Sequence, residues 1–119
     1  MNEPALVSDQ YFVKTAEGLD SHFYVDYYAC QKAAMILKSL NHKLRRQLIE
    51  LILEGKKCTV TELYIKLRIE QSVASQHLGI LRRAGIVSTE RNGKNVFYTF
   101  NHQRLEDINN FIKNLTSSD

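Results

Sequence analysis

The strongest constraint on the fold is a change of hydrophobic periodicity beside Gly85. Upstream, in residues 71–84, apolar side chains recur every three or four positions, which is the spacing of one helix face. Downstream, β-branched and aromatic residues fill two short runs within 86–100, on either side of Asn92-Gly93. Asn-Gly readily supplies the two positive φ values of a type I′ turn. We therefore predict a helix that ends at Gly85 and is followed directly by a β-hairpin.

The polar face of this predicted helix is unusual. Val73, Leu78 and Leu81 form its apolar face. The opposite side carries short, uncharged, hydrogen-bonding residues, namely Gln71, Ser72, Ser75 and Gln76. In a DNA major groove, Gln can pair bidentately with adenine, and Ser can donate to or accept from several base edges. The alternative interpretation is an ordinary amphipathic helix with a solvated polar face.

A shorter helix and a tight turn are predicted immediately before it. Thr59 and Glu62 match a capping box, in which the Thr hydroxyl bonds a backbone amide and the Glu reaches back. The helix then covers residues 60–67, and residues 68–70 form the turn. Two helices joined in this way, over residues 60–84, predict a helix-turn-helix.

Two further helices are predicted upstream. One runs from about residue 20 to 39, capped by Asp20 or Ser21, and carries apolar residues at three- and four-residue spacing. The other covers residues 43–54, between a cap at Asn41 or His42 and a stop at Gly55. The acidic and aromatic residues 1–19 are predicted to form a partly disordered leader in front of a single domain over 20–119.

Apolar residues near both ends of the chain predict a homodimer. Asn101 can cap a last helix, 102–116, whose apolar residues form a seam that can pair with a second copy. Six of the 11 aromatic residues lie within 11–28, which is more than a core of this size absorbs. The predicted interface residues are Phe23, Tyr27, Cys30, Leu105, Ile108, Ile112 and Leu115.

Charge is distributed unevenly along the chain. Residues 1–30 contain one lysine against five acidic residues, whereas residues 31–119 contain 15 basic residues against 8 acidic ones. A basic body favours a polyanionic partner such as double-stranded DNA, with an unevenly charged solvated surface as the alternative. At the predicted hairpin tip, Arg91, Lys94 and Asn95 suit contact with phosphates or with the minor groove.

Several classes of protein are excluded or disfavoured by the sequence. No apolar run approaches the ~20 residues that span a bilayer, and the first ten residues lack the features of a secretion signal. Two cysteines far apart in sequence make no disulfide framework. No phosphate-binding glycine loop, nucleophile elbow or pair of catalytic carboxylates is found. These observations favour a cytoplasmic, non-enzymatic protein without a cofactor.

The order of predicted elements is that of a winged helix-turn-helix, a mainly α fold with a small β-hairpin (α+β). Three motifs carry a more specific resemblance: S-x-H-L at Ser75–Leu78, L-R-x-A-G-I-V at Leu81–Val87, and N-G-K-x-V-x-Y at Asn92–Tyr98. Over roughly residues 32–115 the chain resembles the ArsR-type bacterial repressors. The resemblance implies a homodimeric transcriptional regulator, with helices at both ends forming the dimer interface. It also implies release of operator DNA when a ligand is sensed.

The metal sites of many ArsR-type proteins are not matched by this chain. Where one type of site would place a cysteine pair, the chain has Thr59 and Thr61, with Cys58 one position early. In the last helix, His102 is accompanied by Arg104, which repels a cation. The histidine of the S-x-H-L motif, at position 77, is expected to pack at the edge of the core and to bond backbone or phosphate.

Three effector hypotheses therefore remain open. The first is redox sensing through Cys58 and Cys30, where Lys56 and Lys57 would lower the pKa of Cys58. The second is a small organic ligand bound among the aromatic residues of 23–28, and the third is no effector at all. Because a fold alone does not fix function, a winged helix that binds only proteins is the alternative to a DNA-binding regulator.

Overall fold

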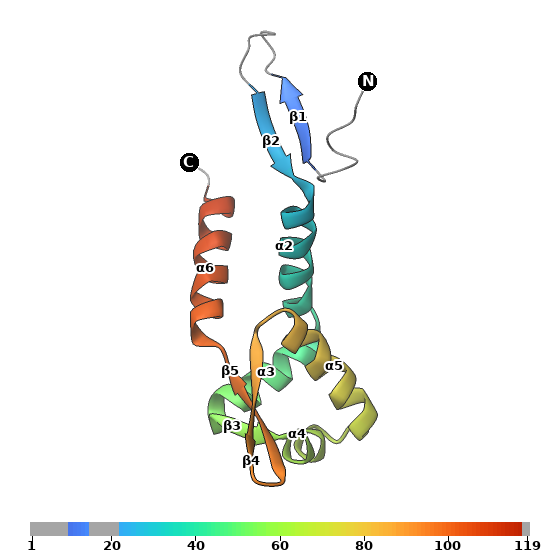
Figure 1. The fold of residues 1–119 in the computed structure, drawn as a ribbon. Coiled ribbons are helices and arrows are strands. Elements are labelled where there is room, and N and C mark those ends of the chain that lie inside the picture. The colour runs from blue at the N-terminus through green and yellow to red at the C-terminus, as the bar shows by residue number, and fades with distance from the viewer. Residues whose placement is uncertain (1–9, 15–21, 118–119) are drawn as a thin grey trace. The chain divides into compact units, whose positions relative to one another are not determined.

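The computed structural model describes residues 10–14 and 22–117, with side chains from Val25 to Ser117. The chain divides into two compact units, residues 1–35 and 36–119. Figure 1 labels the elements, in the order β1 (Gln10–Lys14), β2 (His22–Asp26), α2 (Tyr27–Leu40), α3 (Lys43–Gly55), β3 (Lys57–Thr59), α4 (Val60–Leu67), α5 (Gln71–Arg83), β4 (Val87–Asn92), β5 (Asn95–Phe100) and α6 (His102–Thr116).

The first unit contains a two-stranded hairpin that sequence reasoning missed. β1 and β2 pair antiparallel, from Gln10 opposite Asp26 to Lys14 opposite His22. The prediction of a helix from residue 20 or 21 is therefore wrong, because α2 begins only at Tyr27. Aromatic and β-branched residues favour a strand over 22–25, and the carboxylate of Asp26 then accepts from the amide of Ala29 at 3.1 Å. The rest of the predicted leader lies outside the described residues.

The second unit is built around α3. As predicted, His42 caps this helix, with Nδ1 accepting from the amide of Leu44 at 3.1 Å. The predicted stop at Gly55 is one residue early, because Gly55 is still helical and Lys56 takes the positive φ of 69°. Gly55 is needed for another reason, since a Cβ there would lie 2.9 Å from the Sγ atom of Cys58.

The hydrophobic core brings together α3, α4, α5, the sheet and one residue of α6. Its buried members are Leu48, Ile49, Ile52, Cys58, Leu63, Leu78, Leu81, Ala84, Ile86, Val87, Phe100 and Ile108. Each large apolar side chain buried in this way contributes roughly 1.5–3 kcal/mol. The core therefore fixes both helices of the predicted helix-turn-helix against the same scaffold.

A three-stranded antiparallel sheet, in the order β3-β5-β4, completes the second unit. The predicted hairpin is confirmed, but its turn lies one residue later than expected. Asn92 pairs with Asn95, so the loop is Gly93-Lys94, and only Gly93 has a positive φ (68°). A glycine with positive φ at the first loop position fits a type II′ turn, not the predicted type I′ turn. β3 was not predicted.

Asn101 links the end of α5 to the start of α6. Its Oδ1 accepts from the amide of Arg104, which is the predicted cap, and its Nδ2 donates to the carbonyl of Gly85. Gly85 has a φ of 77° and ends the helix region as predicted. A Cβ at Gly85 would lie 2.8 Å from the guanidinium of Arg104, which would have to move, and the positive φ disfavours a residue with a Cβ in any case.

Candidate nucleic-acid interface

The polar face of α5 is open to solvent. Gln71, Ser72, Ser75 and Gln76 are all exposed. Ala74, Leu78 and Leu81 on the other side of the helix are buried in the core. Val73, which the periodicity placed on the apolar face, is only half-buried. α5 therefore presents uncharged donors and acceptors to a partner while its other face is anchored.

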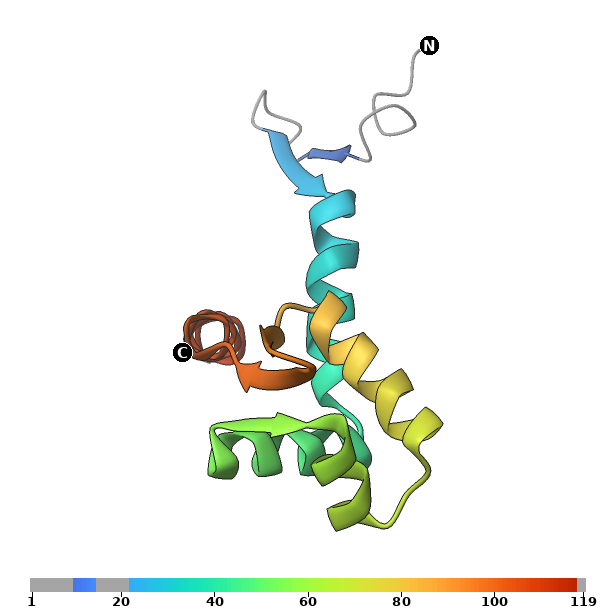
Figure 2. The same cartoon turned by 60° about the horizontal axis from the view of Figure 1, so that its bottom comes forward.

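Local hydrogen bonds hold both ends of α4, and the turn after it leads into α5. Figure 2 shows the path of the chain through this turn. The predicted capping box of α4 is present: the Thr59 hydroxyl accepts from the Glu62 amide, and the Glu62 carboxylate accepts from the Thr59 amide. At the other end, Arg68 takes the left-handed conformation with φ 57°, and its amide and that of Ile69 donate to carbonyls of α4. These bonds set the direction in which the chain enters α5.

The tip of the β4–β5 hairpin carries exposed cations. Arg91, Lys94 and Asn95, the three residues predicted there, are all exposed. The neighbouring carboxylate of Glu90 is paired with Lys57, whose Nζ lies 3.3 Å from Oε1. An exposed ion pair of this kind adds little stability, but it reduces the negative charge beside the two cations. The tip therefore suits contact with a phosphate backbone.

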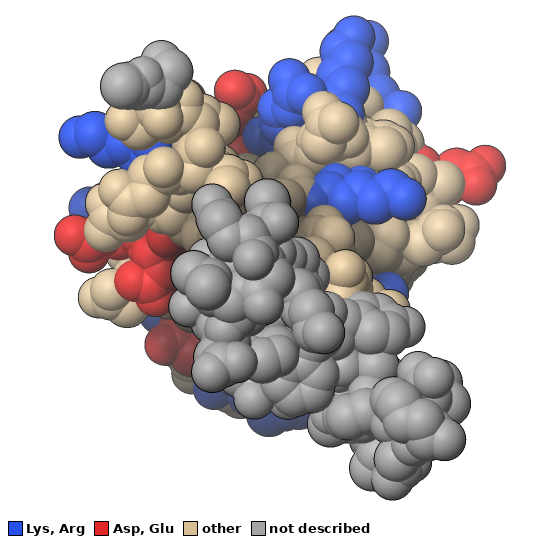
Figure 3. Space-filling view, turned by 90° about the horizontal axis from the view of Figure 1, so that it is seen from above, with Lys and Arg blue, Asp and Glu red and all other residues tan. Residues whose placement is uncertain are grey.

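Charged side chains are also unevenly placed on the surface. In the view of Figure 3, Lys and Arg side chains gather at the upper right, and several carboxylates lie toward the left.

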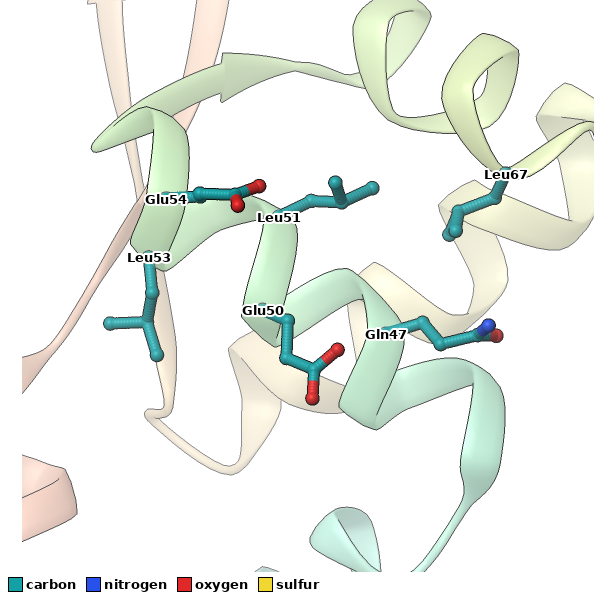
Figure 4. Close-up of a pocket in the computed structure, with 6 residues that line it drawn as sticks. All are labelled: Gln47, Glu50, Leu51, Leu53, Glu54 and Leu67. Atoms are coloured by element: carbon teal, nitrogen blue, oxygen red, sulfur yellow. The ribbon is translucent and has the colours of Figure 1, made fainter.

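A groove of about 580 Å³ is lined by Gln47, Glu50, Leu51, Leu53, Glu54 and Leu67 of α3 and α4 (Figure 4). Its two carboxylates would repel phosphates, so this groove is not part of the candidate interface.

His77 of α5 is half-buried and contacts two residues of the α3 region. Its Nδ1 lies 3.1 Å from Nη1 of Arg45, and its ring centroid lies 4.6 Å from that of His42. Burial lowers the pKa of His77, and the neighbouring His42 and Arg45 lower it further. The expectation that His77 packs at the edge of the core is confirmed, and its partner within the chain is a side chain, not the backbone. Its expected contact with phosphate stays a prediction.

Sequence reasoning missed Arg45, which is only 8% exposed. The signal was present, because Arg45 lies three and four positions before Leu48 and Ile49, on the buried face of α3. A charged residue at an apolar position of a helix identifies a polar contact inside the fold.

The two cysteines have different surroundings. Cys30 is exposed, whereas Cys58 in β3 is buried and its Sγ donates to the carbonyl of Leu51. Burial raises the pKa of the Cys58 thiol, Glu62 raises it further, and Lys66 opposes them. The expectation that Lys56 and Lys57 lower this pKa is wrong, and redox sensing through Cys58 loses its main support. In the described part of the chain, no group of three or more His, Cys, Asp or Glu residues could hold a metal ion.

The predicted dimer residues fall into three groups. Four of them are exposed. In α6, Ile112 is 37% exposed and Leu115 is 67% exposed, and in α2, Tyr27 is 37% exposed and Cys30 is exposed as well. Leu105 is half-buried, and Ile108 is buried in the core of its own chain, so Ile108 is not available to a partner. Phe23 lies in β2, and its side chain is outside the described residues. Phe111 of α6, which was not predicted, is 45% exposed.

Comparison with known proteins places these features in a family context. A sequence profile described as "Bacterial regulatory protein, arsR family" matches residues 42–89, which contain α3, β3, α4 and α5. The biofilm growth-associated repressor of Xylella fastidiosa strain Temecula1 is 38% identical over 81 residues, or 68% of this chain and 70% of that protein. The transcriptional activator HlyU of Vibrio cholerae is 36% identical over 75 residues, or 63% and 68%.

Solved structures agree with the sequence comparisons. Reduced HlyU from Vibrio cholerae N16961 superimposes with a TM-score of 0.58 and 31% identity, covering 76% of this chain and 95% of that chain. The transcriptional repressor PagR of Bacillus anthracis gives a TM-score of 0.59 and 27% identity, covering 72% and 98%. No helix in the described part of this chain is both long enough and apolar enough to cross a membrane.

Proposed function

Since this chain belongs to the ArsR family of bacterial regulatory proteins and is a DNA-binding transcriptional regulator, we propose that it is a homodimeric repressor that reads its operator with α5. The exposed, uncharged face of α5 carries this proposal. A major groove about 12 Å wide admits one helix, whose early residues reach the base edges. Gln71, Ser72, Ser75 and Gln76 occupy the first turn and a half of α5.

The wing supplies the sequence-independent part of the interaction in this proposal. Arg91 and Lys94 neutralise backbone phosphates, with Asn95 as an additional hydrogen-bonding group. Each phosphate that is neutralised releases condensed counterions, so log K falls by roughly 0.9 for each tenfold rise in salt per phosphate. The four base-reading residues of α5 add sequence preference without adding charge.

A dimer is proposed from the second half of α6. Phe111, Ile112 and Leu115 are exposed there, at spacings of one and three residues, while Ile108 holds the helix to its own core. A two-fold dimer binds two half-sites whose centres are one helical turn of DNA, about 34–36 Å, or a multiple of it apart. We therefore expect a palindromic operator. Chromosomal DNA as the target implies a cytoplasmic location.

The proposal is tested by selecting duplexes from a random-sequence pool with the wild-type protein and measuring affinity by fluorescence anisotropy. Gln71→Ala combined with Ser75→Ala should weaken binding to the selected duplex by at least about tenfold, with little change on random duplex. Gln103→Ala, an exposed glutamine of α6, is the matched control and should bind as wild type. Equal loss on both duplexes would show that α5 does not read sequence. Failure to enrich any sequence would favour a winged helix that binds only proteins.

A further inference from the structure

Arg45 of α3 is a buried cation whose charge is not balanced by an acid. It is 8% exposed, and no carboxylate in the described part of the chain pairs with it. Removing a guanidinium from water is costly unless its donors are satisfied. Its Nε donates to the carbonyl of Ser39 at 2.6 Å, its Nη2 to the carbonyl of Lys38 at 3.3 Å, and its Nη1 to Nδ1 of His77 at 3.1 Å.

The two carbonyl partners fix the guanidinium independently of His77. Lys38 and Ser39 belong to the last turn of α2, where carbonyls have no partner within the helix and the helix dipole is negative. A cation is favoured at that position. Ser39 is itself buried, and its hydroxyl donates to the carbonyl of Ile36 at 2.6 Å. Nη1 of Arg45 is therefore held in place to meet α5.

The contact with His77 requires a neutral imidazole. Arginine has donors only, so Nδ1 of His77 must carry a lone pair and the ring proton must lie on Nε2. The adjacent His42 also uses its Nδ1, which accepts from the amide of Leu44 to cap α3. His77 directly follows Gln76 on α5, so its position sets the rotation of the polar face of that helix.

We propose that Arg45 is a positioning residue for DNA recognition, which orients α5 through His77, and that protonation of His77 releases this contact and lowers sequence-specific affinity. The inference rests on the proposed function, in which α5 reads the operator. Arg45 does not touch DNA in this account. It acts by holding the base-reading side chains of α5 at a fixed angle to α3.

The electrostatic surroundings of His77 give the direction of the pH effect. In the described part of the chain, His42 and Arg45 are the charged or titratable groups that face it, and both disfavour a second cation. The pKa of His77 therefore lies below its ordinary value, and acidification is the change that adds its proton. Proton uptake replaces the Nδ1 lone pair by a donor that faces the guanidinium. Acidification also adds positive charge, which strengthens nonspecific binding to phosphates, so the two effects have opposite signs.

The test compares specific and nonspecific binding at pH 7.5 and pH 5.5 at constant salt. The probes are a duplex enriched from a random-sequence pool by the wild-type protein and an unselected duplex of equal length, with circular dichroism recorded at each pH. His77→Asn keeps an acceptor at the δ position but takes no proton, whereas His77→Leu removes the acceptor. His102→Asn, a change at an exposed histidine of α6, is the matched control.

The ratio of specific to nonspecific affinity should fall at least about tenfold in the wild type between pH 7.5 and pH 5.5. The His77→Asn variant should show the wild-type pH 7.5 ratio at both pH values. The His77→Leu variant should show the lowered ratio at both pH values, and His102→Asn should respond to pH as the wild type does. A wild-type ratio independent of pH, or a His77→Asn ratio that falls as in the wild type, would overturn the inference and leave the proposed function intact. A pool from which nothing is enriched would overturn both.

Discussion

Replacement of Asn101 tests whether one side chain joins the end of α5 to the start of α6. Asn101→Ala removes two hydrogen bonds, the cap on the amide of Arg104 and the donation from Nδ2 to the carbonyl of Gly85, each 3.1 Å long. Loss of a helix cap costs about 1 kcal/mol, and loss of a partly buried hydrogen bond costs about 1 kcal/mol more. We therefore expect the free energy of unfolding to fall by about 2 kcal/mol.

Asn101→Ser separates the two contributions. A serine hydroxyl caps α6 as well as the amide oxygen does, but it does not supply the Nδ2 donor. The expected loss is about 1 kcal/mol, half that of Asn101→Ala. Asn110→Ala, at an exposed position of α6, is the control, and it should be neutral or slightly stabilising because alanine is the better helix former.

The measurement is urea unfolding followed by circular dichroism, with all variants at one protein concentration because the proposed dimerisation would couple stability to concentration. A serine variant as stable as the wild type would show that the bond to Gly85 adds nothing. Equal losses for serine and alanine would show instead that the cap does not contribute. Either result would refute the additive account of this junction.

Three further predictions concern positions outside that junction. Lys56 has a φ of 69°, so Lys56→Gly should raise the free energy of unfolding by roughly 1 kcal/mol in urea titrations, while Lys56→Ala, which keeps the Cβ, should not. Leu115 is 67% exposed in the single chain, so Leu115→Asp should reduce the mass measured by light scattering from dimer to monomer without loss of helicity, and an unchanged mass would remove α6 from the interface. The buried thiol of Cys58 should react with an aromatic disulfide reagent at least about tenfold more slowly than the exposed thiol of Cys30. The Cys30→Ser variant reports the rate of Cys58, and the Cys58→Ser variant reports that of Cys30. Equal rates would contradict the burial of Cys58.

Elements with a local chemical cause were predicted well from the sequence. The capping box at Thr59 and Glu62 placed α4 at its observed bounds, and Gly85 and Asn101 marked the boundaries of α5 and α6 correctly. In each case a side chain satisfies a backbone group within a few residues, or a positive φ excludes other residue types. Such causes involve only residues that lie a few positions apart, so a short stretch of sequence is enough to identify them.

Elements that depend on a distant partner were missed or misplaced. β3 is three residues long and exists because β5 pairs with it, with Cys58 opposite Tyr98. The strand 22–26 likewise requires β1 as its partner, and the sequence reads equally well as the start of a helix. The turn shifted by one residue because pairing of β4 with β5, not the Asn-Gly dipeptide alone, sets the register.

The candidate site was predicted in its exposed part and missed in its buried part. The exposed residues of α5 and of the wing follow from residue type and position in the fold. Arg45 does not, because its three partners come from the end of α2 and the middle of α5, up to 32 residues away. Only the spacing of Arg45 with Leu48 and Ile49 hints at its burial.

The division of charge between α5 and the wing has a consequence for how affinity and specificity arise. In α5, the four residues proposed to read bases carry no charge, so they add nothing to the counterion release that drives nonspecific binding. The cations proposed to meet phosphates lie on the hairpin, where they do not depend on the angle of α5. A change that reorients α5 would therefore remove sequence discrimination first and leave binding to random DNA largely unchanged. The buried contact between Arg45 and His77 is placed where such a change would act.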